Sequence, residues 1–171
     1  LRLVKPTAEL KEEYLDMIEE WKQNGGKIVP WVLKEDTSDF QQMVSRFEDY
    51  SCGIGIPEGF VPNSTYWLVR DDNKILGAVN IRHHLNEFLK DRGGHIGYGI
   101  RPGERRKGYA TEMLRMALGI AWEMGIKNVL IICDKDNIAS ARTIILNGGV
   151  LESEDMDEGV VIQRYWIGGV E

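Results

Sequence analysis

A short stretch near the middle of the chain, residues 100–111 (IRPGERRKGYAT), gathers the residue types that hold a phosphate. Residues 105–107 bring positive charge, Gly108 lets the backbone turn tightly, and Ala110 opens an apolar-faced helix. Free amide groups and the dipole at a helix start favour an anion. The pattern predicts a diphosphate site, although charge alone is equally compatible with a solvated basic loop.

Other phosphate motifs do not fit this stretch. A Walker loop requires a lysine after its last glycine, and here Tyr109 follows Gly108. The dinucleotide pattern requires a third glycine where Pro102 stands. The motif that remains is R-x-x-G-x-A. Its position between an apolar strand and an amphipathic helix makes it a more specific sign of a phosphate site.

The elements that must position this loop follow from hydrophobic periodicity and turn residues. We predict one domain over residues 1–171 with an α/β (α+β) fold: a single mixed, mostly antiparallel sheet of six to seven strands, flanked by about four helices. A glycine- and proline-rich loop is expected at 51–63. The predicted strands are 2–7, 64–70, 75–82, 95–101, 128–133, 149–153 and 160–167, and the predicted helices are 8–24, 38–49, 110–124 and 138–147.

Composition narrows the function classes. The chain has 171 residues, of which 43% are hydrophobic and 28% charged, as expected for a globular protein. Its net charge of −6 argues against nucleic acid or an anionic membrane as partner, and no apolar run approaches the roughly 20 residues of a membrane span. Cys52 and Cys133 form no metal-binding pair. We expect no metal site and a reducing, cytoplasmic location.

On these residues the chain resembles the GCN5-related N-acetyltransferase (GNAT) family. The family signature near this loop is roughly V-x-P-x-x-R-G-K-G-x-G/A, and residues 100–110 follow it except at Arg106, where glycine is expected. Downstream, Asn137 opens the next helix in N-I-A-S, and Gly148 falls where the family ends that helix. The order of strands and helices fits nearly the whole chain.

The resemblance implies a sheet splayed between its fourth and fifth strands, with acetyl-CoA as co-substrate. The pantetheine arm would lie along the fourth strand, and the pyrophosphate would lie on the loop amides. Asn137 would contact pantetheine or assist the thioester, although it could equally cap the helix. The implied cofactor-binding residues are Tyr98, Gly99, Ile100, Arg105, Arg106, Lys107, Gly108, Tyr109, Ala110, Thr111, Asn137 and Ser140.

Proton transfer is less well defined by the residues. His95 begins the fourth strand and is the candidate general base, because an unperturbed histidine titrates near neutral pH. Alternation along the strand could instead turn it away from the site. The tyrosine that many family members carry as general acid corresponds here to Ile144. Tyr165 or Tyr109 could replace it, or the thiolate could leave unaided. His83, His84 and Glu87 are further polar candidates at the end of the third strand.

These inferences predict acetyl transfer from acetyl-CoA to a primary amine by direct attack. The acceptor, a small amine or a peptide amine, is not identified by the sequence. Trp31, Trp67 and the loop 51–63 could shape its pocket or belong to the core. The alternatives are a non-catalytic acyl-CoA-binding sensor and a structural or nucleic-acid-binding domain. The resemblance also implies that the final strands could pair two subunits as a homodimer.

Overall fold

The N-terminal half of the computed structural model, which describes residues 1–169, forms a four-stranded antiparallel sheet with two helices. The sheet order is β1-β2-β3-β4, so each strand pairs with its neighbour in sequence. A short 3-10 turn, η1 (Ala8–Leu10), precedes the first helix, and η2 (Trp31–Lys34) lies between the two helices. The longer elements are β1 (Arg2–Val4), α1 (Lys11–Asn24), α2 (Phe40–Ser51), β2 (Asn63–Val69), β3 (Ile75–Arg82) and β4 (Ile96–Ile100).

The C-terminal half adds a separate three-stranded antiparallel sheet with the order β5-β7-β6. Two short elements lead into and out of β4: a π-helical turn, η3 (Leu89–Gly93), and a 3-10 turn, η4 (Pro102–Glu104). The longer elements are α3 (Tyr109–Glu123), β5 (Asn128–Asp134), α4 (Ile138–Leu146), β6 (Val150–Asp157) and β7 (Val160–Gly168).

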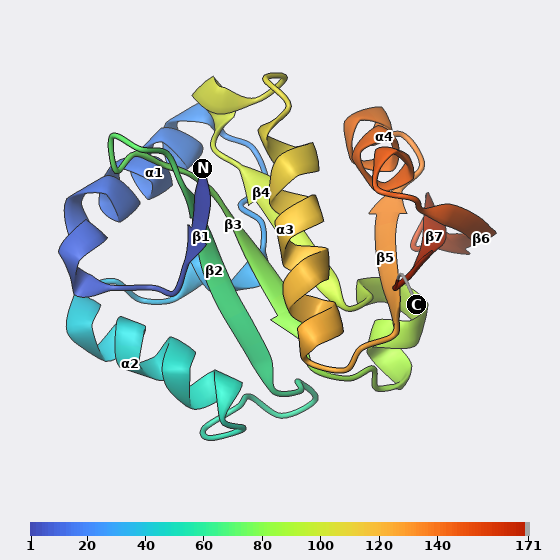
Figure 1. The fold of residues 1–171 in the computed structure, drawn as a ribbon, viewed down its shortest axis with the longest axis horizontal. Helices are drawn as coiled ribbons and strands as arrows, with labels where there is room; N and C mark the ends of the chain where they lie inside the picture. The colour runs from blue at the N-terminus through green and yellow to red at the C-terminus, as the bar shows by residue number, and fades with distance from the viewer. Residues whose placement is uncertain (170–171) are drawn as a thin grey trace.

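Helices cover both faces of the strands and enclose two cores. Helices α1 and α2 bury Tyr14, Trp21 and Phe47 against one face of β2 and β3, the face of Ala78. Helix α3 crosses the other face, the face of Val79, and also covers β5 (Figure 1). Because successive strand residues point to opposite faces, β3 contributes to both cores.

The fold class is confirmed, and the division in the sheet is sharper than expected. Between β4 and β5 no strand ladder forms, so the expected single sheet is two hydrogen-bonded sheets that lie side by side (Figure 1). The two strands touch at one end, where the His95 amide donates to the Leu130 carbonyl oxygen at 2.7 Å. From that contact toward the carboxyl ends of the strands, the edges of β4 and β5 stay unpaired with each other.

The C-terminal hairpin corrects one predicted boundary. We expected a strand at 149–153 followed by an acidic solvated turn, but β6 continues to Asp157 and pairs with Val160. Basic side chains neutralise the acidic stretch: Lys135 pairs with Glu154 at 2.8 Å and Arg92 pairs with Asp157 at 2.9 Å. In the described part of the chain, no helix is both long and apolar enough to cross a membrane.

Candidate functional site

The loop between β4 and α3 makes two left-handed turns. Gly108 has φ 83°, a conformation that glycine adopts without strain. Arg106 has φ 62°, which is uncommon for a residue with a side chain. Arg106 therefore occupies a position that itself favours glycine, which is the residue that the family signature has there.

The first turn of α3 is open to a ligand. Gly108 is its N-cap and has no side chain that could accept a hydrogen bond from the first amides. Along the helix, the Glu112 amide is the first to find a carbonyl partner, since it donates to the Gly108 carbonyl oxygen. The amides of residues 109–111 thus point outward without intrahelical partners, in the direction that favours an anion.

Much of the positive charge around this loop is held by nearby carboxylates. Glu104 is buried and accepts from Lys107 and Lys74, each at 2.9 Å. These hydrogen bonds, from Lys107 first and then Lys74, lower the pKa of Glu104 to about 2. Arg101 is 2% exposed and pairs with Asp16 and Glu20 of α1, so it serves the fold and not a ligand.

Arg105 turns toward α1. Its Nε donates to the Ile100 carbonyl oxygen at 3.0 Å, and its guanidinium lies 5.6 Å from the ring centre of Trp21. The side chain remains exposed, as do those of Arg106 and Lys107. The arrangement leaves the loop with mobile charge around an open helix start.

Hydrogen-bond alternation shows which β4 groups face the gap toward β5, here called the slot. The backbone amide of Arg82 donates to the His95 carbonyl oxygen, and the backbone amide of Arg101 donates to the Leu76 carbonyl oxygen. These two bonds fix which residues of β4 pair with β3. Gly99 therefore turns its amide and carbonyl to β3, and Tyr98 and Ile100 turn theirs to the slot. Of the three expected backbone contacts on β4, the register contradicts that of Gly99.

A side-chain hydrogen bond crosses the slot. The Tyr98 hydroxyl lies 2.9 Å from the Ser140 hydroxyl, on the first turn of α4. Burial raises the pKa of Tyr98 to about 12, so the phenol keeps its proton at neutral pH. Asn137 is exposed, and its side chain accepts the Ser140 amide at 3.1 Å, which makes it the N-cap of α4.

His95 lies at the closed end of the slot. It is buried, and its Nδ1 accepts the Leu130 amide hydrogen at 2.9 Å. Since an amide only donates, the proton of the neutral ring sits on Nε2. Burial, followed by the charges of Arg82 and His84, lowers the pKa of His95 to about 4. The candidate base is therefore neutral at pH 7, with its lone pair engaged.

The other candidate acids and pocket residues belong mainly to the core. Ile144 is fully buried, and the Tyr165 hydroxyl is buried and donates to Gln163 at 2.8 Å. Trp67 is also fully buried. Trp31 is only partly buried, and its ring centre lies 4.7 Å from that of Phe60. Trp31 and Phe60 are thus the aromatic pair available to a ligand on the α1–α2 face.

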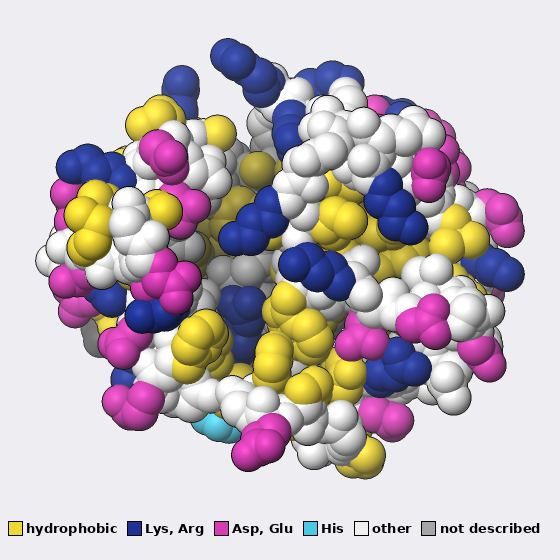
Figure 2. Space-filling model, turned by 180° about the vertical axis from the view of Figure 1, so that it is seen from behind, with side chains coloured by type: hydrophobic (Ala, Val, Ile, Leu, Met, Phe, Trp, Pro, Cys, Tyr) yellow, Lys and Arg dark blue, Asp and Glu magenta, His cyan; other side chains and the backbone are white. Residues whose placement is uncertain are grey.

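That face carries residues that sequence reasoning did not select. Asn80 and Arg82 share the Ala78 face of β3, and Gly97 of β4 lies opposite Asn80. A side chain at Gly97 would meet the Arg82 guanidinium at 3.0 Å. A polar and a charged residue at alternating positions of an otherwise apolar strand were the available signal. Viewed from this side, the molecule is hollowed along its middle, with a basic side chain deep inside (Figure 2).

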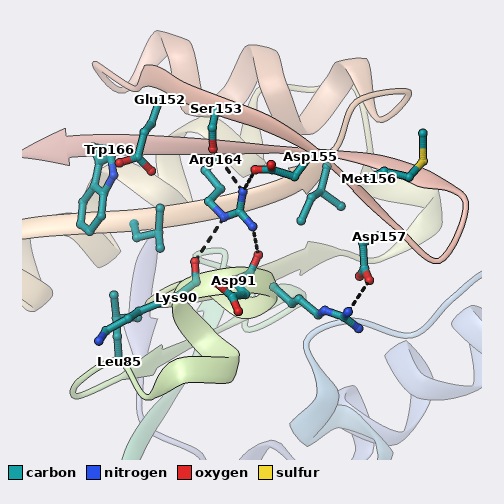
Figure 3. A pocket seen from close by; sticks show the side chains of 13 residues that line it. Leu85, Lys90, Asp91, Glu152, Ser153, Asp155, Met156, Asp157, Arg164 and Trp166 are labelled. Carbon is teal, nitrogen blue, oxygen red and sulfur yellow. Dashed lines mark hydrogen bonds and ion pairs between the residues drawn. The ribbon is translucent and has the colours of Figure 1, made fainter.

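A separate cavity of about 640 Å³ lies between η3 and the β6–β7 hairpin. Arg164 occupies its centre and donates to the carbonyl oxygens of Lys90 and Asp91 and to the side chains of Ser153 and Asp155 (Figure 3). Because its guanidinium is already surrounded by acceptors, Arg164 is not free to hold an anionic substrate.

Comparison with known proteins identifies the family and the fold of the chain. Residues 1–149 match the family model described as an acetyltransferase (GNAT) domain. No curated protein sequence matches the chain significantly.

Three solved acetyltransferases illustrate the structural similarity. A mutant spermidine N-acetyltransferase from Vibrio cholerae is 14% identical, with 98% of this chain and 95% of that chain covered at a TM-score of 0.66. The microcin C7 self-immunity acetyltransferase in complex with acetyl-CoA and AMP is 18% identical (97% and 91% covered, TM-score 0.65). A ribosomal L7/L12 α-N-protein acetyltransferase in complex with coenzyme A is 15% identical (97% and 92% covered, TM-score 0.69). These structural similarities show a common fold. The family model shows that the chain belongs to the GNAT acetyltransferase family.

Proposed function

We propose that the protein transfers an acetyl group from acetyl-CoA to a primary amine. The observation that carries the proposal is the uncapped start of α3, with left-handed Gly108, at the open end of a slot edged by β4 backbone groups that do not pair with β5. The amides of residues 109–111 suit a pyrophosphate, and the slot-facing groups of Tyr98 and Ile100 suit an extended amide-containing arm. Acetyl-CoA, when bound, supplies an activated acetyl thioester.

In this reaction a C–N bond forms, the C–S bond breaks, and the amine proton leaves as the thiolate gains one. Tyr98 is the proposed proton donor to the thiolate, because its hydroxyl lies in the slot and is protonated at neutral pH. It would take the role for which Ile144 has no functional group.

His95 stays the proposed base, with a constraint. To accept a proton at Nδ1 it must release the Leu130 amide, and its low pKa makes it a weak base for an amine. His95→Asn keeps an oxygen acceptor for Leu130, whereas His95→Ala removes it. If His95 is the base, both variants lose activity; if it only holds β4 to β5, the asparagine variant keeps most of it.

The alternative is an acyl-CoA-binding sensor without catalysis, which the engaged lone pair of His95 favours. A screen of amines with acetyl-CoA, read as thiol release and as acetylated product by mass, separates the two. Acetylated product with any amine supports the enzyme. Tight acetyl-CoA binding with no product from any amine supports the sensor.

A further inference from the structure

We propose that the amine acceptor carries a carboxylate, which Arg82 binds on the α1–α2 face beside Gly97. The inference rests on the proposed acetyl transfer and names the substrate class of that same site. An amino acid has the required chemistry: one carboxylate close to one primary amine.

The first observation is that Arg82 is half-buried without a carboxylate. Its Nη1 donates to the carbonyl oxygens of Gly93 and Gly94, at 3.0 and 3.3 Å. Throughout residues 1–169, no aspartate or glutamate forms an ion pair with it, and Nε and Nη2 donate no hydrogen bond to the protein. Burying a charge is costly unless a partner arrives, so the free side of this guanidinium suits an anion from outside.

The second observation is the character of its surroundings. The titratable group coupled to it is His95, which is neutral at pH 7, so the positive charge at this place is that of Arg82 itself. A guanidinium without a carboxylate partner attracts a carboxylate and repels the additional ammonium group of a polyamine.

The third observation is the position of the guanidinium relative to the slot. It rests on Gly97, one residue before Tyr98, whose backbone faces the slot. Two residues further along β4, the Val29 carbonyl covers Gly99 and closes the face. Arg82 therefore lies beside the amino end of β4, about 7 Å along the strand from the point where Val29 covers it.

The site is distinct from the cofactor loop. Arg105 and Gly108 follow the carboxyl end of β4, whereas Arg82 lies beside its amino end. Five strand residues separate these ends, roughly 16 Å at ~3.3 Å per residue. The phosphates of the cofactor bind at the far end, so the anion that Arg82 meets comes from the acceptor.

Nearby, Asn80 adds a buried acceptor without a partner. Its Nδ2 donates to Asn63 at 2.7 Å and to Thr65 at 3.1 Å, while Asn63 donates to the Val61 carbonyl. This chain of bonds fixes the orientation of the amide and leaves the Asn80 Oδ1 unpaired. A carbonyl oxygen beside a carboxylate-binding arginine complements the N–H groups of an amino acid.

The test uses matched amines with and without the carboxylate: alanine with ethylamine, phenylalanine with phenethylamine, and lysine with cadaverine. We expect the wild type to acetylate the carboxylated member with a kcat/KM about 10- to 100-fold higher, the size of a hydrogen-bonded charge pair. Arg82→Gln should abolish the preference, and Arg82→Lys should keep part of it. Arg92→Gln, on exposed η3, is the matched control and should retain it. Melting temperatures establish that each variant is folded.

Equal or higher kcat/KM for the decarboxylated amines would overturn the inference while leaving acetyl transfer intact, as would a preference that survives Arg82→Gln. If no amine is acetylated, the proposed function fails, and titration with N-acetylphenylalanine tests the carboxylate site by itself. Binding that Arg82→Gln removes supports the site; absence of binding to the wild type refutes it.

Discussion

Two arginines lie at opposite ends of the β3–β4 pair and have different surroundings, one buried and one half-buried. Arg101, just after β4, is 2% exposed and reaches Asp16 and Glu20 of α1, each at 2.5 Å. Arg82, the last residue of β3, meets two backbone carbonyls and basic neighbours. Both guanidiniums face the α1–α2 side, so the face of the sheet on which they lie does not separate them.

The pKa values of the two guanidiniums are shifted in opposite directions, as their different partners require. Burial alone lowers the pKa of Arg82 to about 10. For Arg101 burial acts the same way, but the hydrogen bonds to Asp16 and Glu20 outweigh it and raise the pKa. A buried cation whose neighbours supply its counter-charge stabilises the fold, whereas one without counter-charge is prepared for a ligand.

The largest effect on stability is expected when each of the two charges is removed in turn. Arg101→Met should lower the free energy of unfolding by about 3 kcal/mol, because it removes hydrogen bonds to two carboxylates and to the Ile75 carbonyl oxygen. Arg82→Met should cost about 1 kcal/mol, because it loses only hydrogen bonds to carbonyls. Urea unfolding at neutral pH measures both. Similar losses in the two variants would mean that Arg82 is as structural as Arg101.

The Arg101 end was the more predictable one from sequence. Residues 105–110 are adjacent in the chain, and a strand, a glycine turn and a helix start require no distant partner. Even there, the role of Arg101 could not be predicted, since its carboxylate partners on α1 lie 81 and 85 residues away in the sequence.

The Arg82 end depends on contacts between residues far apart in sequence. Whether His95 faces solvent or Leu130, and whether Tyr98 reaches Ser140, follows from how β4 lies against β5 and α4. Strand alternation predicts only the face of the sheet to which a side chain points, and not the residues that it meets there. The length of β6 was missed for a related reason, because salt bridges from other elements stabilise its acidic residues.

The second prediction concerns the cofactor end. Gly108→Val should weaken acetyl-CoA binding about 30-fold, because a β-branched residue is strained at φ 83° and its side chain projects where a phosphate would lie. Gly119→Ala, inside α3 with no atom near its added methyl group, is the control and should bind normally. Calorimetric titration gives the affinities. Unchanged binding to the valine variant would place the phosphates elsewhere.

A smaller effect is expected in the middle of the slot. Tyr98→Phe should lower kcat about 10-fold with acetyl-CoA affinity unchanged, since it removes a proton donor while a thiolate still leaves readily. Tyr165→Phe, whose hydroxyl contacts only Gln163, should leave kcat unaltered. Steady-state kinetics at saturating amine decides it, and equal kcat values in the wild type and both variants would exclude Tyr98 as the donor.

The smallest expected effect is on the pH dependence of stability, and it tests His95 at the closed end of the slot. The pKa of His95 lies at about 4 in the folded protein against an ordinary 6.5, so between these values the unfolded chain binds a proton that the folded chain does not. The stability from neutral His95 is therefore complete above pH 6.5 and is lost as the pH falls toward 4.

His95→Asn removes this titration but retains an acceptor for the Leu130 amide. Between about pH 7 and pH 5.5 the wild type should lose about 1 kcal/mol more stability than the variant. Urea unfolding at the two pH values measures the difference. Parallel losses would show that His95 titrates normally, with its ring free of Leu130, and would return it to the role of an accessible base.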